Sequence, residues 1–372
     1  METIMNKPPI IWLNLSLFVL TLGGAITLVP WRAITHGFDA VEWVAFVVLV
    51  FYSGLSITAG YHRLWSHKAY KANAVVRFFY ALGGALALQN SALHWSSDHR
   101  VHHKHVDNND KDPYSANMGF WYSHIGWMLR EYQAHRYHDY NNVRDLQNDT
   151  IVMWQHKHYL LLTILMNVGL PALLGWFHGD VLSMLLLAGL ARLVLVHHCT
   201  FFINSLAHIW GSQPYTDKNT ARDNPLLAFL TYGEGYHNFH HIFENDYRNG
   251  IHWWDYDPTK WLIKGLSWCG LAGDLRKVPQ ERIESAKLQM QLKRSQHRIA
   301  GHKDAEELLE SLQLEYERLK QQLLAYYEAK KELLEARRAE LCVKELSPKV
   351  AELKNRLRLA QQNWASVTAA CR

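Results

Sequence analysis

Four apolar stretches, which cover about residues 10–30, 41–61, 159–177 and 181–206, constrain the fold of this chain more than any other feature. Each is close to or above the roughly 20 residues that a membrane-spanning helix needs. The alternative is a soluble protein with buried helices, in which four such runs joined in pairs would be unusual. The first stretch is too long for a cleavable signal peptide, and no small-residue cleavage site follows it. We therefore predict an all-α protein with four transmembrane helices.

The distribution of basic residues orients these four helices. Arg32 is the only basic residue between the first two stretches, none lies between the third and the fourth, and eleven lie in the connection 62–157. Under the positive-inside rule, both termini and a helical cap made of residues 62–157 and 207–273 lie in the cytoplasm. The apolar run 75–95 is short and interrupted by polar residues, so we predict a packed or interfacial helix there rather than a fifth span.

The tail, residues 274–372, differs in character from the rest of the chain. It holds 20 basic and 15 acidic side chains, whereas residues 1–273 hold 19 of each, so the net charge of +5 belongs to the tail. Apolar residues recur there at heptad spacing, and a second apolar face follows Ser347 and Pro348. A helical hairpin, a coiled coil between copies of the chain and a basic helix on anionic lipid all produce this pattern. The first face consists of Leu309, Leu312, Tyr316, Leu319, Leu323, Tyr326 and Leu333, and the second of Val350, Leu353, Leu357, Ala360 and Trp364.

Three histidine clusters lie in the predicted cap. Their sequences are HRLWSH at 62–67, DHRVHH at 98–103 and YHNFHH at 236–241. In the last two, histidines at positions i, i+3 and i+4 share one face of a helix, so they converge on one metal ion or bridge two. His62 and His67 lie about 140° apart on an ideal helix, and they converge only if the helix ends or unwinds between them. Eight histidines exceed the capacity of one ion, so the clusters predict two metal ions.

The residue types leave the identity of the metal open. Imidazole suits zinc, copper, iron and nickel about equally. The clusters lack the Glu-x-x-His motifs of soluble di-iron bundles, so a nitrogen-rich site is expected. The cysteines form no Cys-x-x-Cys motif, which argues against a zinc ribbon, an iron–sulfur cluster and a disulfide framework. They are Cys199, Cys269, Cys342 and Cys371.

The order of the clusters, together with KDPYSANMGFWYSHIGWM at 111–128 and NSLAHIWG at 204–211, resembles one family closely. It is the integral-membrane acyl-CoA delta-9 (stearoyl-CoA) desaturase family of the bacterial type, here with an added coiled-coil-like tail. The resemblance covers about residues 40–275. It implies an oxidoreductase with two iron ions, which uses dioxygen and two electrons to place a cis double bond between carbons 9 and 10 of a long saturated acyl chain, with water as the other product. The implied metal ligands are His62, His67, His99, His102, His103, His208, His237, His240 and His241, with Asn204 reaching one iron through water.

The resemblance also implies a kinked tunnel for the acyl chain. The positions that match its wall are Gln89, Asn90, Trp95 and Thr200. Animal members have a basic residue that contacts CoA before Asp98, whereas this chain has Ser97. Asp98, Arg222 and Asp223 are nevertheless assigned to the substrate site, because an Arg–acidic pair occurs at the matching place in the family. The acyl donor stays open between acyl-CoA, a phospholipid and acyl carrier protein.

The chain shows no flavin, haem or iron–sulfur motif, so electrons from NAD(P)H are expected through a separate reductase and electron carrier. Membrane lipid is an expected partner, self-association through the tail stays open, and no nucleic-acid partner is expected. Short connections between spans and the lack of an N-terminal targeting segment favour a bacterial inner membrane, with the endoplasmic reticulum as the alternative. Two other functions stay open: a fatty acyl or alkyl hydroxylase on the same site, and a metal transporter with histidine-lined spans.

Two further groups of residues carry expectations. Arg192 lies inside the fourth apolar stretch, where an ionisable group is costly; a carbonyl or carboxylate partner is expected, and a functional role stays open. Five histidines near the site are candidates for hydrogen bonds to the metal ligands. They are His94, His105, His124, His197 and His198.

Overall fold

The computed structural model describes residues 7–300, 304–339, 341 and 343–371, so His302 and Cys342 lie outside the described part of the chain. The chain divides into two compact units. The first comprises Met1–Ser212 and Asn219–Lys277, and the second comprises Gln213–Lys218 and Val278–Arg372. Both units are built almost entirely of helices, which confirms the prediction of an all-α fold.

The first unit contains the apolar helices. Among the described residues, four helices are long and apolar enough to cross a membrane, as predicted. Helix α1 (Trp12–Thr35) exposes most of its apolar side chains; Leu13 and Ile34, for example, are 80% and 86% exposed, as a surface in contact with lipid tails requires. The four helices span Trp12–Thr35, Ala40–Ser66, Tyr159–His178 and Val181–Ile209.

Three of these four helices change winding along their length. The second consists of α2 (Ala40–Leu55) and a π-helical segment, η1 (Ser56–Ser66). The other two are interrupted by the π-helical segments η6 (Leu165–Gly169) and η7 (Leu185–Ala191). The remaining segments are α8 (Tyr159–Ile164) and α9 (Leu170–His178) in the third helix, and α10 (Val181–Met184), α11 (Arg192–Asn204) and α12 (Leu206–Ile209) in the fourth.

Segment η1 shows how His62 and His67 of the first histidine cluster converge, because the helix unwinds between them. The amide of His67 donates to the carbonyl of His62 over 3.1 Å, a hydrogen bond from residue i+5 to residue i. A π-helix has more residues per turn than an α-helix, so residues five apart become neighbours on one face. The helix thus unwinds where the two histidines need to converge, and it continues to Ser66 rather than ending near residue 61.

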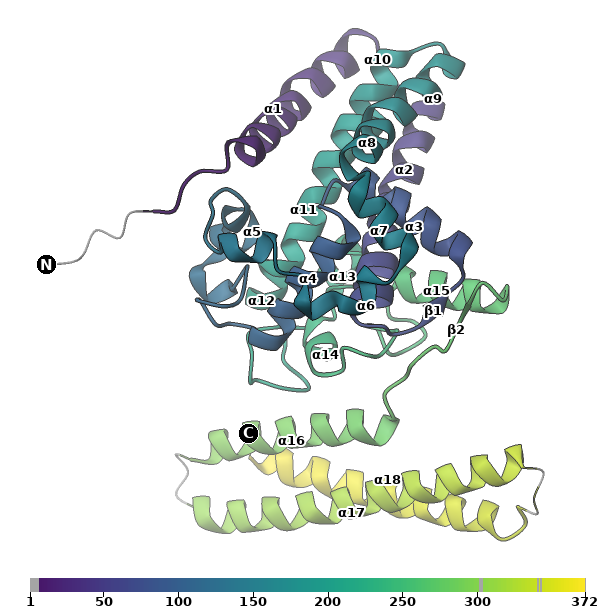
Figure 1. Cartoon of the computed structure of the whole chain (residues 1–372). Coiled ribbons are helices and arrows are strands. Elements are labelled where there is room, and N and C mark those ends of the chain that lie inside the picture. The colour runs from purple at the N-terminus through teal and green to yellow at the C-terminus, as the bar shows by residue number, and fades with distance from the viewer. Residues whose placement is uncertain (1–6, 301–303, 340, 342, 372) are drawn as a thin grey trace, which may run out of the picture. The chain divides into compact units, whose positions relative to one another are not determined.

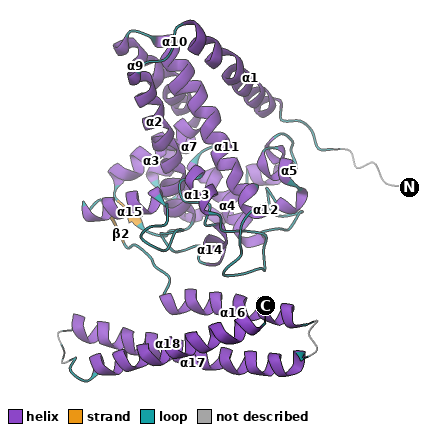
Figure 2. Cartoon of the chain, turned by 180° about the vertical axis from the view of Figure 1, so that it is seen from behind, coloured by secondary structure: helices purple, strands orange, loops and turns teal. Residues whose placement is uncertain are grey.

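The cap lies at one end of the apolar helices, opposite the turn between α9 and α10 (Figures 1 and 2). The run 75–95 forms two helices, α3 (Ala74–Ala87) and α4 (Ala92–His105), and α3 packs against the second and third apolar helices. The side chains of Asn73 and Ser91 cap the N-termini of α3 and α4. The other helices are α5 (Phe120–His124), α6 (Arg144–Gln147), α7 (Thr150–Lys157), α13 (Pro225–Leu230), α14 (His237–Ile242) and α15 (Pro258–Trp268), and β1 (Lys71–Ala72) pairs antiparallel with β2 (Ala272–Gly273).

The second unit consists of α16 (Gln280–Ile299), α17 (Ala305–Arg338) and α18 (Leu346–Ala370). Helices α17 and α18 form a hairpin, one of the three arrangements that the heptad pattern left open, and α16 packs against it. The two apolar faces meet within the chain. Leu312, Leu319, Leu323, Leu357, Ala360 and Trp364 are buried in the core of this unit, together with Leu288, Leu292 and Ile299 of α16.

Gly235 provides a test of how tightly the third histidine cluster is positioned. A Cβ atom at this position would lie 2.2 Å from the backbone nitrogen of Ala228, which cannot move without displacing α13. We expect Gly235→Ala to lower the yield of folded protein and its thermal midpoint in detergent. Gly265→Ala is the matched control, because a Cβ there meets nothing within 4 Å in the middle of α15. The control is expected to be neutral or stabilising by about 0.5–1 kcal/mol. Equal midpoints for the two variants would contradict this packing.

Candidate metal centre

The histidines that the sequence predicted as metal ligands form two groups within the described part of the chain. In each group the ligand nitrogens lie within 4.8 Å of one another. Eight of the nine come from the three clusters, and the ninth, His208, comes from the end of the fourth apolar helix. The first group consists of His62, His67, His99, His103 and His240, and the second of His102, His208, His237 and His241.

The helical spacing divides each histidine triplet between the two groups. On α4, His99 and His103 are four residues apart and belong to the first group, whereas His102 belongs to the second. On α14 the division is reversed, because His237 and His241 belong to the second group and His240 to the first. Positions i+3 and i+4 share a broad face with position i but lie on either side of it, about 100° apart around the helix axis, so one triplet can reach two centres. The triplets therefore bridge two centres instead of converging on one.

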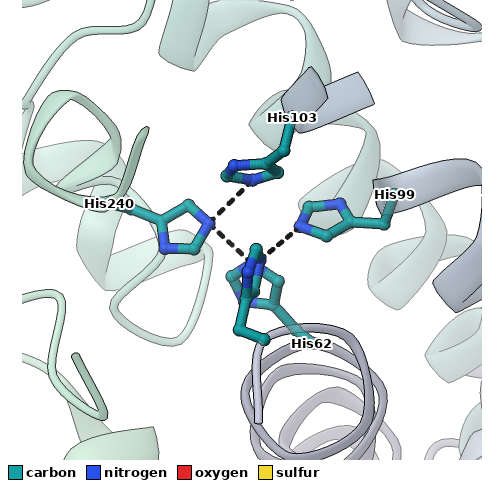
Figure 3. A group of neighbouring side chains, drawn as sticks. His62, His99, His103 and His240 are labelled. Carbon is teal, nitrogen blue, oxygen red and sulfur yellow. Dashed lines mark hydrogen bonds between the residues drawn. The ribbon is translucent and has the colours of Figure 1, made fainter. Parts of the chain in front are cut away.

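The distances within each group fit one ion. In the first group, the Nε2 atoms of His62 and His240 are 2.9 Å apart, those of His67 and His99 are 2.8 Å apart, and those of His103 and His240 are 3.0 Å apart. Figure 3 shows His62, His99, His103 and His240 pointing toward one another. Nitrogens that each lie about 2.1 Å from a metal ion, at right angles around it, are about 3.0 Å apart.

The second group has the same spacing. The Nε2 atoms of His208 and His237 are 3.1 Å apart, as are those of His237 and His241, and His102 Nε2 lies 3.3 Å from His241 Nε2. Each group thus brings imidazole nitrogens to the separation of neighbouring ligands of one metal ion. The donor set consists of imidazole alone, which is the nitrogen-rich site that the sequence predicted.

Carboxylates and hydroxyls contact the opposite nitrogens of several ligands. His62 Nδ1 lies 3.0 Å from Glu234, His102 Nδ1 lies 2.8 Å from Asp112, and His103 Nδ1 lies 3.0 Å from Glu244. Such contacts fix the orientation of the ring and direct Nε2 toward the metal. Hydroxyls do the same for two other ligands: Tyr114 lies 3.2 Å from His99 Nδ1, and Thr220 lies 2.8 Å from His208 Nδ1.

Burial favours the neutral form of three histidines of the first group, which is the form that binds a metal. Desolvation, followed by the neighbouring histidines, lowers the pKa of His67, His99 and His240 well below its usual value. The pKa of Glu234 is lowered to about 2, so its carboxylate stays charged. Burial raises this pKa, but the contacts with Arg63 and His62 lower it by a larger amount. The carboxylate that contacts His62 is therefore ionised.

The three carboxylates were missed in the sequence, where the candidates for these contacts were other histidines. Of those candidates, His124 contacts His198 and Ser205, and His197 contacts backbone carbonyls of α3. A signal was present, however. Glu234 begins the segment EGYHNFHH that contains the third cluster, Asp112 lies in KDPY at the start of 111–128, and Glu244 follows the third cluster by three residues. A charged residue that is buried beside a ligand histidine is a natural candidate for orienting it.

A cavity runs along the first histidine group. His62 and His99 form part of its wall, together with apolar side chains from α1 and α11. Five of the seven residues predicted to bind substrate line it, as does Asn204. These five are Gln89, Asn90, Trp95, Asp98 and Thr200. Gln89 donates to the hydroxyl of Thr200 over 2.9 Å, so two of the polar groups in the wall satisfy each other.

The other two predicted substrate residues are not among the described residues that line this cavity. Arg222 donates from its backbone amide to the carbonyl of Ala207 and from its guanidinium to Gly211. Asp223 accepts a hydrogen bond from the amide of Phe239 at the start of α14. The carbonyl of Arg222 accepts from the amide of His237, so both residues contact the segment that carries the third histidine cluster, and a direct role in substrate binding stays a prediction.

A substitution of Asp112 tests whether the carboxylate contacts to the Nδ1 atoms of the histidines affect metal binding. Asp112→Asn keeps the size of the side chain but removes the charge that orients His102, so we expect metal affinity at the second group to fall by about 10- to 100-fold. Metal content measured after dialysis against a graded series of chelator concentrations reports this loss. Asp110→Asn is the matched control, because Asp110 is exposed and only two residues away. Wild-type retention of metal in Asp112→Asn would show that the contact does not tune the site.

Comparisons with known proteins agree with the geometry. A family model described as fatty acid desaturase matches residues 40–267, which is more than half of the chain. Acyl-CoA desaturase 1 of Saccharomyces cerevisiae is 44% identical over 287 residues, which cover 76% of this chain and 55% of the yeast protein. A probable acyl-CoA desaturase of Schizosaccharomyces pombe is 48% identical over 248 residues, or 66% of this chain and 51% of that protein. Stearoyl-CoA desaturase 5 of Bos taurus is 38% identical over 253 residues, or 66% of this chain and 73% of the bovine protein. This chain thus spans about half the length of the two fungal relatives.

Proposed function

Because the chain belongs to the fatty acid desaturase family, we propose that it is a fatty acyl delta-9 desaturase that introduces a cis double bond into a long saturated acyl chain. One observation carries the proposal: the cavity that would hold such a chain is walled by His62 and His99, ligands of the first histidine group. The four apolar helices and the family make it an integral membrane protein. We take acyl-CoA as the donor, since the relatives named above are acyl-CoA or stearoyl-CoA desaturases.

We propose one iron ion in each histidine group. Imidazole does not choose among the transition metals, so the choice of iron rests on the family, in which iron is the general cofactor. When bound, the two ions would supply the oxidant: dioxygen, two electrons and two protons are consumed with two hydrogens of the substrate, and two waters leave. Asn204, in the cavity wall, is the proposed additional ligand through water.

The chain itself has to position an unreactive group. A methylene offers no acidic proton, leaving group or polar handle, so side chains contribute by holding it at a fixed place beside the oxidant. Trp95 stacks on the imidazole of His99 with ring centroids 4.8 Å apart, and both line the cavity. The contact fixes the wall of the cavity relative to a metal ligand. The hydrogen bond between Gln89 and Thr200 fixes the wall at another point.

Orientation, electron supply and location complete the proposal. The basic residues of the connection 62–157 support a cytoplasmic location for the histidine groups, where a separate reductase and carrier would deliver electrons from NAD(P)H. We propose a bacterial inner membrane, with the endoplasmic reticulum as the alternative, since the relatives named above come from fungi and cattle. The apolar stripes of the tail are buried against each other within one chain, so self-association through them is not part of the proposal.

Complementation tests the reaction directly. In a host that makes no unsaturated fatty acids, expression of the chain is expected to restore cis-monounsaturated chains, and His240→Ala is expected to abolish them because it removes a ligand of the first group. His36→Ala, at an exposed position between the first two helices, is the control. Mass spectrometry of the lipids reads the outcome. A product that has gained one oxygen instead of losing two hydrogens would identify a hydroxylase.

Metal content tests the two-ion proposal independently of activity. Protein purified from iron-replete cells is expected to carry about two iron ions per chain. His240→Ala and His241→Ala each remove a ligand from a different group, so each is expected to lower the content toward one. The double variant should hold less than either. One zinc ion per chain in a fully active enzyme would overturn the proposal of two irons.

A further inference from the structure

Helix α3 ends against the third and fourth apolar helices, and its last residues, Ala85, Leu86 and Ala87, are fully buried. The last carbonyls of a helix have no partner within the helix. In a membrane-embedded region each of them needs a partner from the protein, because an unsatisfied carbonyl there costs several kcal/mol by order of magnitude. These carbonyls belong to residues 85–88, and that of Ala85 also accepts from the amide of Leu88 over 3.2 Å.

Three side chains from the neighbouring apolar helices supply these partners. Asn167 donates to the carbonyl of Ala85 over 3.1 Å, and Arg192 donates to that of Leu86 over 2.7 Å. His197 Nε2 lies 3.1 Å from the carbonyl of Ala87 and 3.2 Å from that of Leu88. A carbonyl only accepts, so this nitrogen carries the proton. We call Asn167, Arg192 and His197 the carbonyl clamp.

Arg192 connects the members of the clamp. Its guanidinium also donates to the side-chain oxygen of Asn167 over 2.8 Å and to the carbonyl of Ala188 over 3.2 Å, and the residue is fully buried. Within the described part of the chain, no carboxylate pairs with it. A positive charge at the C-terminal end of a helix is favoured by the helix dipole, which offsets part of the cost of burying it. Of the two kinds of partner expected for Arg192 from the sequence, a carbonyl or a carboxylate, the structure has carbonyl oxygens.

The segment that follows the clamped carbonyls is strained and lines the cavity. Leu88 and Asn90 have φ angles of 52° and 76°, in the left-handed region that residues other than glycine seldom adopt. Leu88, Gln89 and Asn90 all lie in the cavity wall, and Gln89 bonds to Thr200. Strained backbone persists only where its surroundings hold it in place. The clamp is the set of side chains that holds the carbonyls directly before this turn.

We propose that Asn167, Arg192 and His197 are positioning residues which, by fixing the turn 88–90, determine which pair of methylenes lies beside the first histidine group. The inference rests on the proposed function and extends it to specificity. None of the three residues is among the described residues that line the cavity, so they act through the turn rather than on the substrate. A displacement of about 1 Å at a reacting centre costs about 100-fold in rate. A small shift of the turn should thus change both the rate and the position of the double bond.

His197→Phe is the central variant, because it removes the hydrogen bonds and keeps a ring that still stacks on Phe201. Arg192→Gln removes the positive charge and the guanidinium with its several N–H donors. Arg192→Lys keeps the positive charge and a single donor group. We expect the fraction of double bonds away from the main position to rise roughly tenfold in His197→Phe and Arg192→Gln, and kcat to fall more than KM rises. Arg192→Lys should restore part of the wild-type distribution. Gas chromatography and mass spectrometry of derivatised fatty acids locate the double bonds.

Two controls separate positioning from stability. His198→Phe makes the same change one residue along α11, where the ring contacts His124 instead of α3. Arg32→Gln removes another buried arginine, which contacts Ser183 and Asp180 at the other end of the apolar helices. Both should keep the wild-type double-bond position whatever their yield. Wild-type positions in His197→Phe and Arg192→Gln at wild-type iron content would overturn the clamp, whereas a wild-type protein that makes no unsaturated product would overturn the proposed function itself.

Discussion

A buried group of charges, Arg63 with Glu234 and Asp257, is the interaction on which the metal centre depends. Arg63 donates to Glu234 over 2.9 Å and to Asp257 over 3.0 Å, and all three side chains are buried. Glu234 in turn contacts His62, and Asp257 accepts from the amides of Asn249 and Gly250. The group thus joins the second apolar helix to the segment before α14 and to the loop before α15. Removing one member of such a group leaves an uncompensated buried charge, at a cost of about 3–5 kcal/mol.

The position of Arg63 links this group to the histidines. It follows His62 in the π-helical segment, so the winding that brings His62 and His67 together also aims Arg63 at the carboxylates. Glu234 contacts both residues, which makes it a structural anchor and a partner of a metal ligand at the same time. π-Helical segments are rare and occur frequently at functional sites, because an extra residue per turn changes which side chains are neighbours. Here the change converts a pair of histidines with an unsuitable spacing into two ligands of one group.

Much of the site could be predicted from the sequence, for reasons that are local. The i, i+3, i+4 spacing at 99–103 and 237–241 constrains three imidazoles to adjacent faces of a short helix, and the helices form as expected. The division of each triplet between two groups could not be predicted, because it depends on the angle at which α4 faces α14. Nor could local spacing assign His208, a lone histidine at the end of an apolar helix; the resemblance to the family assigned it. Contacts between distant segments, such as Glu234 with His62, become visible only when the fold is known.

The apolar helices set a second structural requirement, which concerns the backbone carbonyls at the end of α3 rather than the histidines. A helix that ends among apolar helices leaves its last carbonyls without water, so they need partners from the protein. Helix α3 ends in this way, and the strained turn after it lies in the cavity wall. Hydrogen bonds from Asn167, Arg192 and His197 make this ending stable. An arginine buried among apolar helices is therefore consistent with the proposed function: an acyl chain would offer the wall no polar contact, so the carbonyls of the wall need polar partners from the protein.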